Sequence, residues 1–101
     1  TNEVSGPIFK SMRRDGSRLT LAFTHDKGLK TSDGGALTGF AVAGADRKYV
    51  WAQAKIMGRE IVVSSDNVPA PVSVRYAWAD NPVCNLCNEA DLPASPFKAE
   101  L

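Results

Sequence analysis

The chain has one histidine, His25, and this limits the nucleophilic chemistry that it can perform. A serine-type hydrolase needs a nucleophile, a base within hydrogen-bond reach and a third group that orients the base. His25 stands at the start of a glycine-rich segment, and the sequence has no Gly-x-Ser-x-Gly motif. We therefore expect His25 to be an exposed or capping loop residue, and we assign no catalytic residue to this chain.

The two cysteines, Cys84 and Cys87, form one Cys-x-x-Cys pair. Structural zinc sites commonly use two such pairs, or one pair and two histidines, and a single histidine does not complete the set. A redox pair normally opens a helix after a strand, and neither the nearby Pro82 nor the strand-like pattern around it supplies that setting. Free thiols or one local disulfide are favoured, and we expect no metal and no other cofactor.

Acidic and aromatic side chains offer two further kinds of site. Asp80, Glu89 and Asp91 could perform glycosidase chemistry if a cleft held two of them at the required separation, but acids in loops are usually turn formers. The larger aromatics could stack on sugars or fill a core, because they carry the largest apolar areas. Core or interdomain packing is preferred for this set, which comprises Trp51, Tyr76, Trp78 and Phe97.

The bulk composition describes one ordinary globular domain. The chain has 101 residues, of which 44% are hydrophobic and 23% charged, with a net charge of +1. This balance argues against a nucleic-acid partner, which usually requires a concentrated basic face, and no apolar run has the length of a membrane helix. No signal peptide is visible and Thr1 is not an initiator methionine, so we expect residues 1–101 to be a single domain cut from a longer protein.

Short runs with a period of two predict an all-β domain. Leu19, Leu21 and Phe23 alternate with polar or small residues, and Asp15-Gly16 before them is a strong hairpin signal. Residues 25–37 read as a loop, and the last fifth reads as an irregular, proline-rich tail that ends in a short edge strand. The expected strands are residues 7–14, 17–24, 39–43, 48–57, 60–64 and 72–79. Six to seven strands at this spacing predict a small antiparallel β-sandwich, Ig-like or jelly-roll-like, with a small barrel as the competing architecture.

The strand at residues 72–79 and the tail carry a resemblance to a known family. The segment Val-Arg-Tyr-Ala-Trp-Ala-Asp-Asn-Pro at 74–82, then Asn85-Leu86, Asn88 and Leu-Pro-Ala-Ser-Pro-Phe at 92–97, is similar to the C-terminal end of the sialate O-acetylesterases. The segment Ser-Gly-Pro-Ile-Phe-Lys-Ser-Met at 5–12 resembles the part of that family that follows the catalytic domain. Residues 40–46, 50–52 and 62–65 also fit, whereas Cys87 departs from the aromatic residue expected there.

The resemblance implies an accessory role rather than a catalytic one. Enzymes of this family remove O-acetyl esters from sialic acids with a serine–histidine–aspartate triad on an SGNH-type α/β domain. The motifs of that triad are absent here, and His25 does not match the family's histidine block. The resemblance thus implies a C-terminal β-domain that packs on the catalytic SGNH-type domain of the same parent chain, in a secreted or periplasmic enzyme.

The same resemblance suggests which residues make contacts. The candidate interdomain or ligand-contact residues are Arg75, Tyr76, Trp78, Asp80, Asn81, Asn85 and Phe97. A carbohydrate-binding module for sialylated glycans is the alternative function, and it predicts that at least two of Trp51, Tyr76 and Trp78 are exposed in a row. Neither function involves a nucleic acid or a membrane.

Overall fold

A computed structural model describes residues 6–24, 27–77 and 84–101. These residues form strands, turns and extended segments, and none of them belongs to a helix that could span a membrane. The strands are β1 (Ile8–Asp15), β2 (Arg18–Thr24), β3 (Lys30–Thr31), β4 (Phe40–Ala43), β5 (Val50–Trp51), β6 (Gln53–Met57), β7 (Glu60–Ser64), β8 (Ser73–Tyr76), β9 (Leu86–Cys87) and β10 (Phe97–Glu100).

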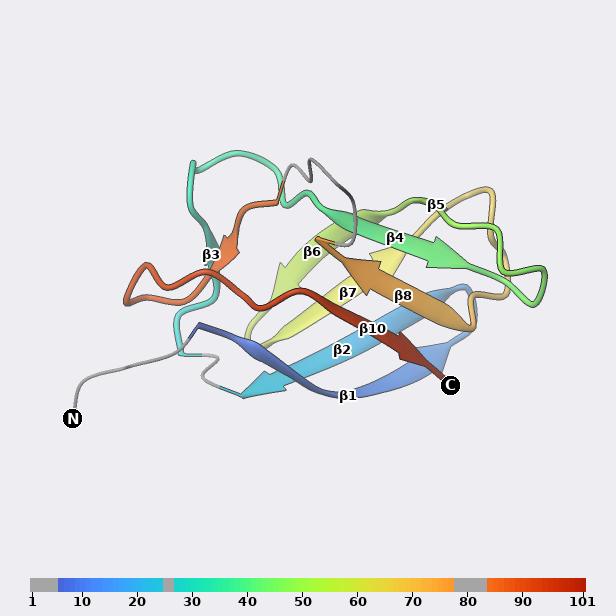
Figure 1. The fold of residues 1–101 in the computed structure, drawn as a ribbon, viewed down its shortest axis with the longest axis horizontal. Coiled ribbons are helices and arrows are strands. Elements are labelled where there is room, and N and C mark those ends of the chain that lie inside the picture. Colours follow the sequence, from blue (N-terminus) through green and yellow to red (C-terminus); the bar gives the residue numbers. More distant parts are fainter. Residues whose placement is uncertain (1–5, 25–26, 78–83) are drawn as a thin grey trace.

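Two four-stranded antiparallel sheets form the body of the domain (Figure 1). The first sheet has the strand order β1-β2-β7-β6, and the second has the order β10-β8-β4-β5. Strands β3 and β9 form a separate two-stranded sheet beside them. The predicted all-β class and small antiparallel sandwich are therefore confirmed.

The core lies between the two sheets and is supplied by the alternating residues of their inner faces. Leu19, Leu21 and Phe23 are buried as the period of two predicts, and they join Val74 and Tyr76 of the second sheet in one cluster. In the strand expected at residues 72–79, the period of two places Val72, Val74, Tyr76 and Trp78 on the face predicted to point inward. Val74 and Tyr76 do so, Val72 is only half-buried, and Trp78 lies outside the described residues.

Two hairpins build the first sheet. The β1–β2 turn has Gly16 at φ 65°, and the β6–β7 turn has Gly58 at φ 66°, a conformation that glycine adopts without steric cost. β1 contains a bulge, because Phe9 pairs with Phe23 and Ser11 with Ala22, which leaves Lys10 as the extra residue.

The single long strand expected at residues 48–57 is wrong, because the chain changes sheets within it. Trp51 pairs with Ala41 in the second sheet, whereas Gln53 pairs with Ser64 in the first. Ala52 joins the two strands and donates its N–H to the carbonyl of Phe40 at 2.9 Å. This crossing raises the strand number above the predicted six to seven, since one run supplies both β5 and β6.

The proline-rich tail is ordered where the structure describes it. The expected short edge strand is β10, which pairs with β8 from Phe97 to Glu100. The loop expected at residues 25–37 is not wholly irregular, because Lys30 and Thr31 pair with Cys87 and Leu86 of the tail. This pairing joins segments far apart in the sequence, so no local pattern signals it.

Candidate functional site

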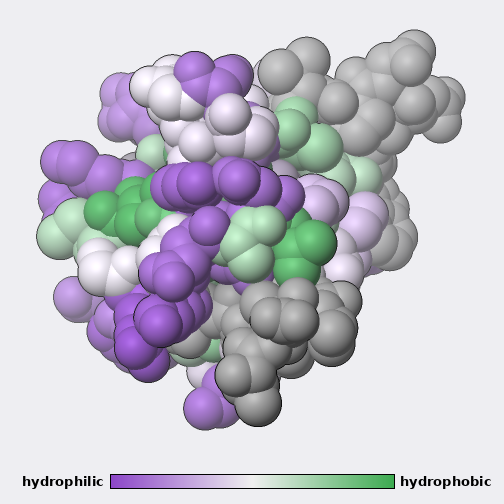
Figure 2. Space-filling view, turned by 90° about the vertical axis from the view of Figure 1, so that its left-hand side faces the viewer, coloured by the Kyte–Doolittle hydropathy of each residue, from purple (hydrophilic) through white to green (hydrophobic). Residues whose placement is uncertain are grey.

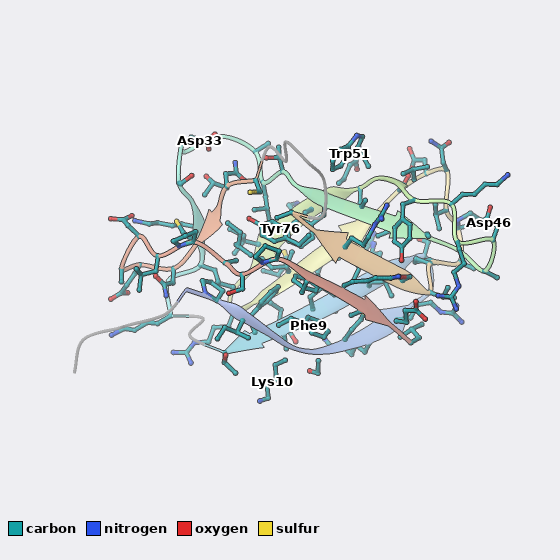
Figure 3. All side chains as sticks on the ribbon, viewed as in Figure 1. Phe9, Lys10, Asp33, Asp46, Trp51 and Tyr76 are labelled. Atoms are coloured by element: carbon teal, nitrogen blue, oxygen red, sulfur yellow. The ribbon has the colours of Figure 1, made fainter. Side chains whose placement is uncertain are left out.

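The outer face of the second sheet carries one row of side chains across four strands. Trp51 in β5 pairs with Ala41 in β4, Ala41 pairs with Arg75 in β8, and Arg75 pairs with Lys98 in β10. Their neighbours Val50, Val42, Val74 and Tyr76 turn toward the core, so period-two alternation turns this row toward solvent. Trp51 is 68% exposed and projects beyond the edge of the ribbon (Figure 3). We call Tyr49, Trp51, Ala41, Arg75 and Lys98 the aromatic–basic face.

Tyr49 stiffens this face by lying across the sheet. Its hydroxyl makes a short hydrogen bond with the hydroxyl of Ser73, which also donates to the carbonyl of Ala99 at 3.1 Å. The guanidinium carbon of Arg75 lies 3.6 Å from the centre of the Tyr49 ring, a cation–π contact. The contact with Tyr49 helps to explain why Ser73 is fully buried although it lies on the outer face of its sheet.

Arg75 has no acidic partner in the part of the chain that the structure describes. Glu100, which precedes the C-terminal residue, forms an ion pair with Arg47, and it also lies 3.9 Å from the ammonium of Lys98. The buried Nε of Arg75 finds no hydrogen-bond partner among the described residues. Among the described residues, the guanidinium of Arg75 is therefore held against an aromatic ring and has no carboxylate partner.

A second region, which we call the loop end, consists of residues 27–38 and 84–95. Asn85 is its centre: its side-chain amide donates to the carboxylate of Asp33 at 3.0 Å and to the carbonyl of Ala36 at 2.7 Å. Its side-chain oxygen accepts the N–H of Thr38 at 2.9 Å. Asn85 is thereby buried and fixes the preceding loop. Figure 2 looks onto this end and shows a described surface that is mostly hydrophilic, with small hydrophobic areas.

Two ion pairs lie in the rest of the loop end. Lys30 pairs with Asp91 at 2.7 Å and Lys27 with Glu89 at 3.7 Å, and both pairs are solvent-exposed. The pKa of Asp33 is lowered, first by the N–H of Gly35 and next by the Asn85 amide. Hydrogen bonds to a carboxylate favour its charged form, so Asp33 is held ionised.

Tyr76 and Phe97, which were candidate contact residues but for which core or interdomain packing was preferred, lie in and against the core. Tyr76 is 1% exposed, and its hydroxyl accepts the N–H of Leu86 at 2.9 Å. Phe97 is half-buried and stacks on Phe9 with ring centres 4.7 Å apart. Burial raises the pKa of Tyr76, because the charged phenolate would lose its solvation. The cause of their placement is the β8–β10 pairing, which sets Phe97 opposite Tyr76 on the inner face.

The candidate contact residues thus fall into three places. Arg75 is on the outer face of the second sheet, Asn85 is at the loop end, and Tyr76 and Phe97 are internal. The structure does not bring them together into one pocket. The remaining candidates, Trp78, Asp80 and Asn81, lie outside the described residues, as does His25.

The two cysteines, Cys84 and Cys87, are not joined by a disulfide. Both are free: Cys84 is exposed, whereas Cys87 is buried in β9. Burial raises the pKa of the Cys87 thiol. Across residues 6–24, 27–77 and 84–101, no group of three or more histidine, cysteine or acidic side chains is placed to hold a metal ion.

Comparison with known proteins finds a similar fold within a larger solved structure. No protein-family model matches the sequence, and no match is found among the curated proteins. Among solved structures, a carbohydrate acetylesterase from Xanthomonas citri matches with 44% sequence identity and a TM-score of 0.90. The chain is similar to one part of a carbohydrate acetylesterase. The match covers 95% of this chain but 23% of the acetylesterase.

Sequence reasoning missed part of the aromatic–basic face. Arg75 was a candidate and Trp51 was considered for sugar stacking, but Tyr49 and Lys98 were not singled out. The shared face of Tyr49 and Trp51 is readable from their spacing. No sequence signal places Lys98 beside Arg75, because that neighbour depends on the β8–β10 register.

Proposed function

We propose that residues 1–101 are the non-catalytic C-terminal accessory domain of a sialate O-acetylesterase, packed on the SGNH-type catalytic domain of the same parent chain. The observation that carries this proposal is the match to a carbohydrate acetylesterase over 95% of this chain and 23% of that one. A match of that kind is expected when a small domain belongs to a larger esterase. The sialate substrate rests on the tail motifs at residues 74–82 and 92–97.

The loop end supports a packing role. Asn85 fixes the loop at residues 32–38, and the N-terminal segment lies against the tail, where the N–H of Ser95 donates to the carbonyl of Pro7 at 3.1 Å. A domain that precedes Gly6 would emerge beside this organised, polar surface. Interfaces between domains of one chain are commonly polar, which this surface would suit.

A domain deletion in the parent enzyme tests the packing role. We expect removal of the segment corresponding to residues 6–101 to lower the melting temperature and soluble yield, because the docking surface of the catalytic domain would be exposed to water. Turnover of an O-acetylated sialic acid should fall with stability, while the isolated accessory domain should hydrolyse no ester. Unchanged stability, yield and turnover after the deletion would refute the packing role.

The proposal also concerns the compartment of the parent enzyme. We infer a secreted or periplasmic enzyme, by analogy with the family that the tail resembles. Fractionation of cells that express the parent gene would test this: recovery in the cytoplasm alone would contradict it.

Binding of a sialylated glycan is the second candidate function. This function predicted that at least two of Trp51, Tyr76 and Trp78 are exposed; Tyr76 is buried, Trp51 is exposed, and Trp78 lies outside the described residues. The exposure of Trp51, in the same row as an Arg75 that has no carboxylate partner among the described residues, favours glycan binding at the outer face of the second sheet.

A further inference from the structure

We propose that the aromatic–basic face is a binding site for a single acidic sugar residue, with Trp51 stacked on the sugar ring and Arg75 bound to its carboxylate. The inference deepens the second candidate function and does not depend on the packing role. Its basis is the row Trp51–Ala41–Arg75–Lys98 across the second sheet.

Trp51 supplies an apolar surface that the domain itself does not use. Its side chain is among the few large hydrophobic side chains left exposed, at 68%. A tryptophan ring offers a broad flat area and one polar N–H, which suits a ligand with an apolar face and polar edges. The ring carbons and hydrogens of a pyranose form such a face.

Ala41 leaves the space that a ligand would fill. It lies between Trp51 and Arg75 in the row, and its methyl group is the smallest side chain there. Two strand spacings, about 10 Å, separate the backbones of Trp51 and Arg75. In the proposed site, one sugar ring lies over Ala41 between the two larger side chains.

Arg75 selects the charge of the ligand. A guanidinium binds a carboxylate through two parallel hydrogen bonds, and the Tyr49 ring at 3.6 Å already holds it in place. Its freedom is therefore reduced before the ligand arrives, which lowers the entropy cost of binding. Lys98, the neighbour of Arg75 in β10, adds positive charge, and Glu100 shares its carboxylate between Arg47 and, at 3.9 Å, Lys98. A carboxylate-bearing sugar complements this arrangement better than a neutral one.

Titration of the 101-residue chain followed by NMR tests the site, with glucuronic acid and N-acetylneuraminic acid as the acidic probes. We expect millimolar affinity, with shifts at the Trp51 indole N–H and the Arg75 side chain. Glucose should bind more weakly and shift Trp51 alone, and acetate should shift Arg75 alone. Acidic probes that shift neither residue, or that shift only residues elsewhere, would overturn the proposal.

Matched variants separate this face from the rest of the surface. Trp51→Ala and Arg75→Gln should each weaken binding of the acidic probes at least about 10-fold, and Arg75→Lys should weaken it less, because the charge remains while the planar fork is lost. The controls are Met57→Ala and Arg18→Gln, since both residues line a depression of about 450 Å³ on the first sheet. Loss of binding in the controls, or retained binding in Trp51→Ala and Arg75→Gln, would overturn the proposal.

A dispersed amide spectrum is the check that each variant is folded. If Arg75→Gln does not fold, the affinity of Arg75→Lys decides the role of Arg75.

Discussion

At the scale of single residues, polar side chains decide how the loops of this domain are held. Asn85 satisfies both its donor and its acceptor capacity with Asp33, Ala36 and Thr38, all on one loop. A buried side-chain amide is well suited to holding a loop, because it can donate to backbone carbonyls and accept from backbone N–H groups that would otherwise be left unpaired. A single residue of the tail therefore sets the conformation of a loop far from it in sequence.

Replacement of Asn85 by alanine should cost about 2–3 kcal/mol of unfolding free energy, because it leaves the N–H of Thr38 and the carbonyl of Ala36 without partners. The control is Asn67→Ala, an exposed position where the change should stay within about 0.5 kcal/mol. Urea denaturation measures both. Equal stability of the two variants would contradict the role given to Asn85.

Asn85→Ala should also change the titration of the Asp33 carboxyl group. The pKa of Asp33 lies below its ordinary value in the folded chain, so its hydrogen bonds stabilise the fold above the unfolded pKa and this stabilisation is lost as the pH falls through the folded pKa. Asn85→Ala removes one of the donors to the Asp33 carboxylate, so the Asp33 pKa should rise toward its ordinary value. Carboxyl NMR shifts followed against pH would show it.

At the scale of elements, the aromatic ring of β10 joins the tail to the core. Phe97 packs its ring against Phe9, Phe23, Phe40 and Tyr76, with centre distances between 4.7 and 6.4 Å. These partners come from both sheets, so β10 does more than cover an edge. The tail is thus part of the core rather than an appendage.

We expect Phe97→Ala to lower the unfolding free energy by about 2–4 kcal/mol, somewhat less than for a fully buried phenylalanine. Trp51→Ala is the matched aromatic control and should change stability by less than about 1 kcal/mol, because the Trp51 ring is 68% exposed. Thermal or urea unfolding of both variants checks the difference. A larger loss at Trp51 than at Phe97 would mean that the ring contacts of the tail contribute little.

The sequence pattern predicted those strands whose own residues favour a strand, whatever lies beside them. Residues 60–64 form β7 as expected, because Ile61, Val62 and Val63 favour a pleated strand. The crossing at Ala52 and the β3–β9 pair were not predictable, since each depends on which distant strand lies alongside. The same holds for the site: Arg75 was found from the sequence, but its place next to Lys98 and over Tyr49 is a product of register and packing.

At the scale of the whole molecule, the N-terminal segment and the tail are packed together. Gly6 is buried, and a Cβ at this position would lie 1.8 Å from the carbonyl oxygen of Pro93. Only glycine permits so close an approach of the two backbones. The beginning of β1 and the tail segment before β10 therefore hold each other in place.

Gly6→Ala should push the N-terminal segment away from the tail and cost about 2–3 kcal/mol, because the clash is with backbone atoms that cannot rotate aside. Gly35→Ala is the control, since its Cβ would meet Asp33 no closer than 3.5 Å. Hydrogen exchange at the Ser95 amide, which donates to Pro7, should accelerate in Gly6→Ala alone. Unchanged exchange at Ser95 would show that the two segments are not coupled.

The bulge at Lys10 has a consequence for self-association. Among the described strands β1 is the longest, and it is the outermost strand at one side of the first sheet; a flat edge of that length is a template for pairing with another chain. The extra residue between Phe9 and Ser11 bends this edge, and the exposed charges of Arg13, Arg14 and Asp15 follow it. The other outer strands are short, and β5 has only two residues. Deletion of Lys10 would straighten the longest edge of the domain and make it a site for edge-to-edge aggregation.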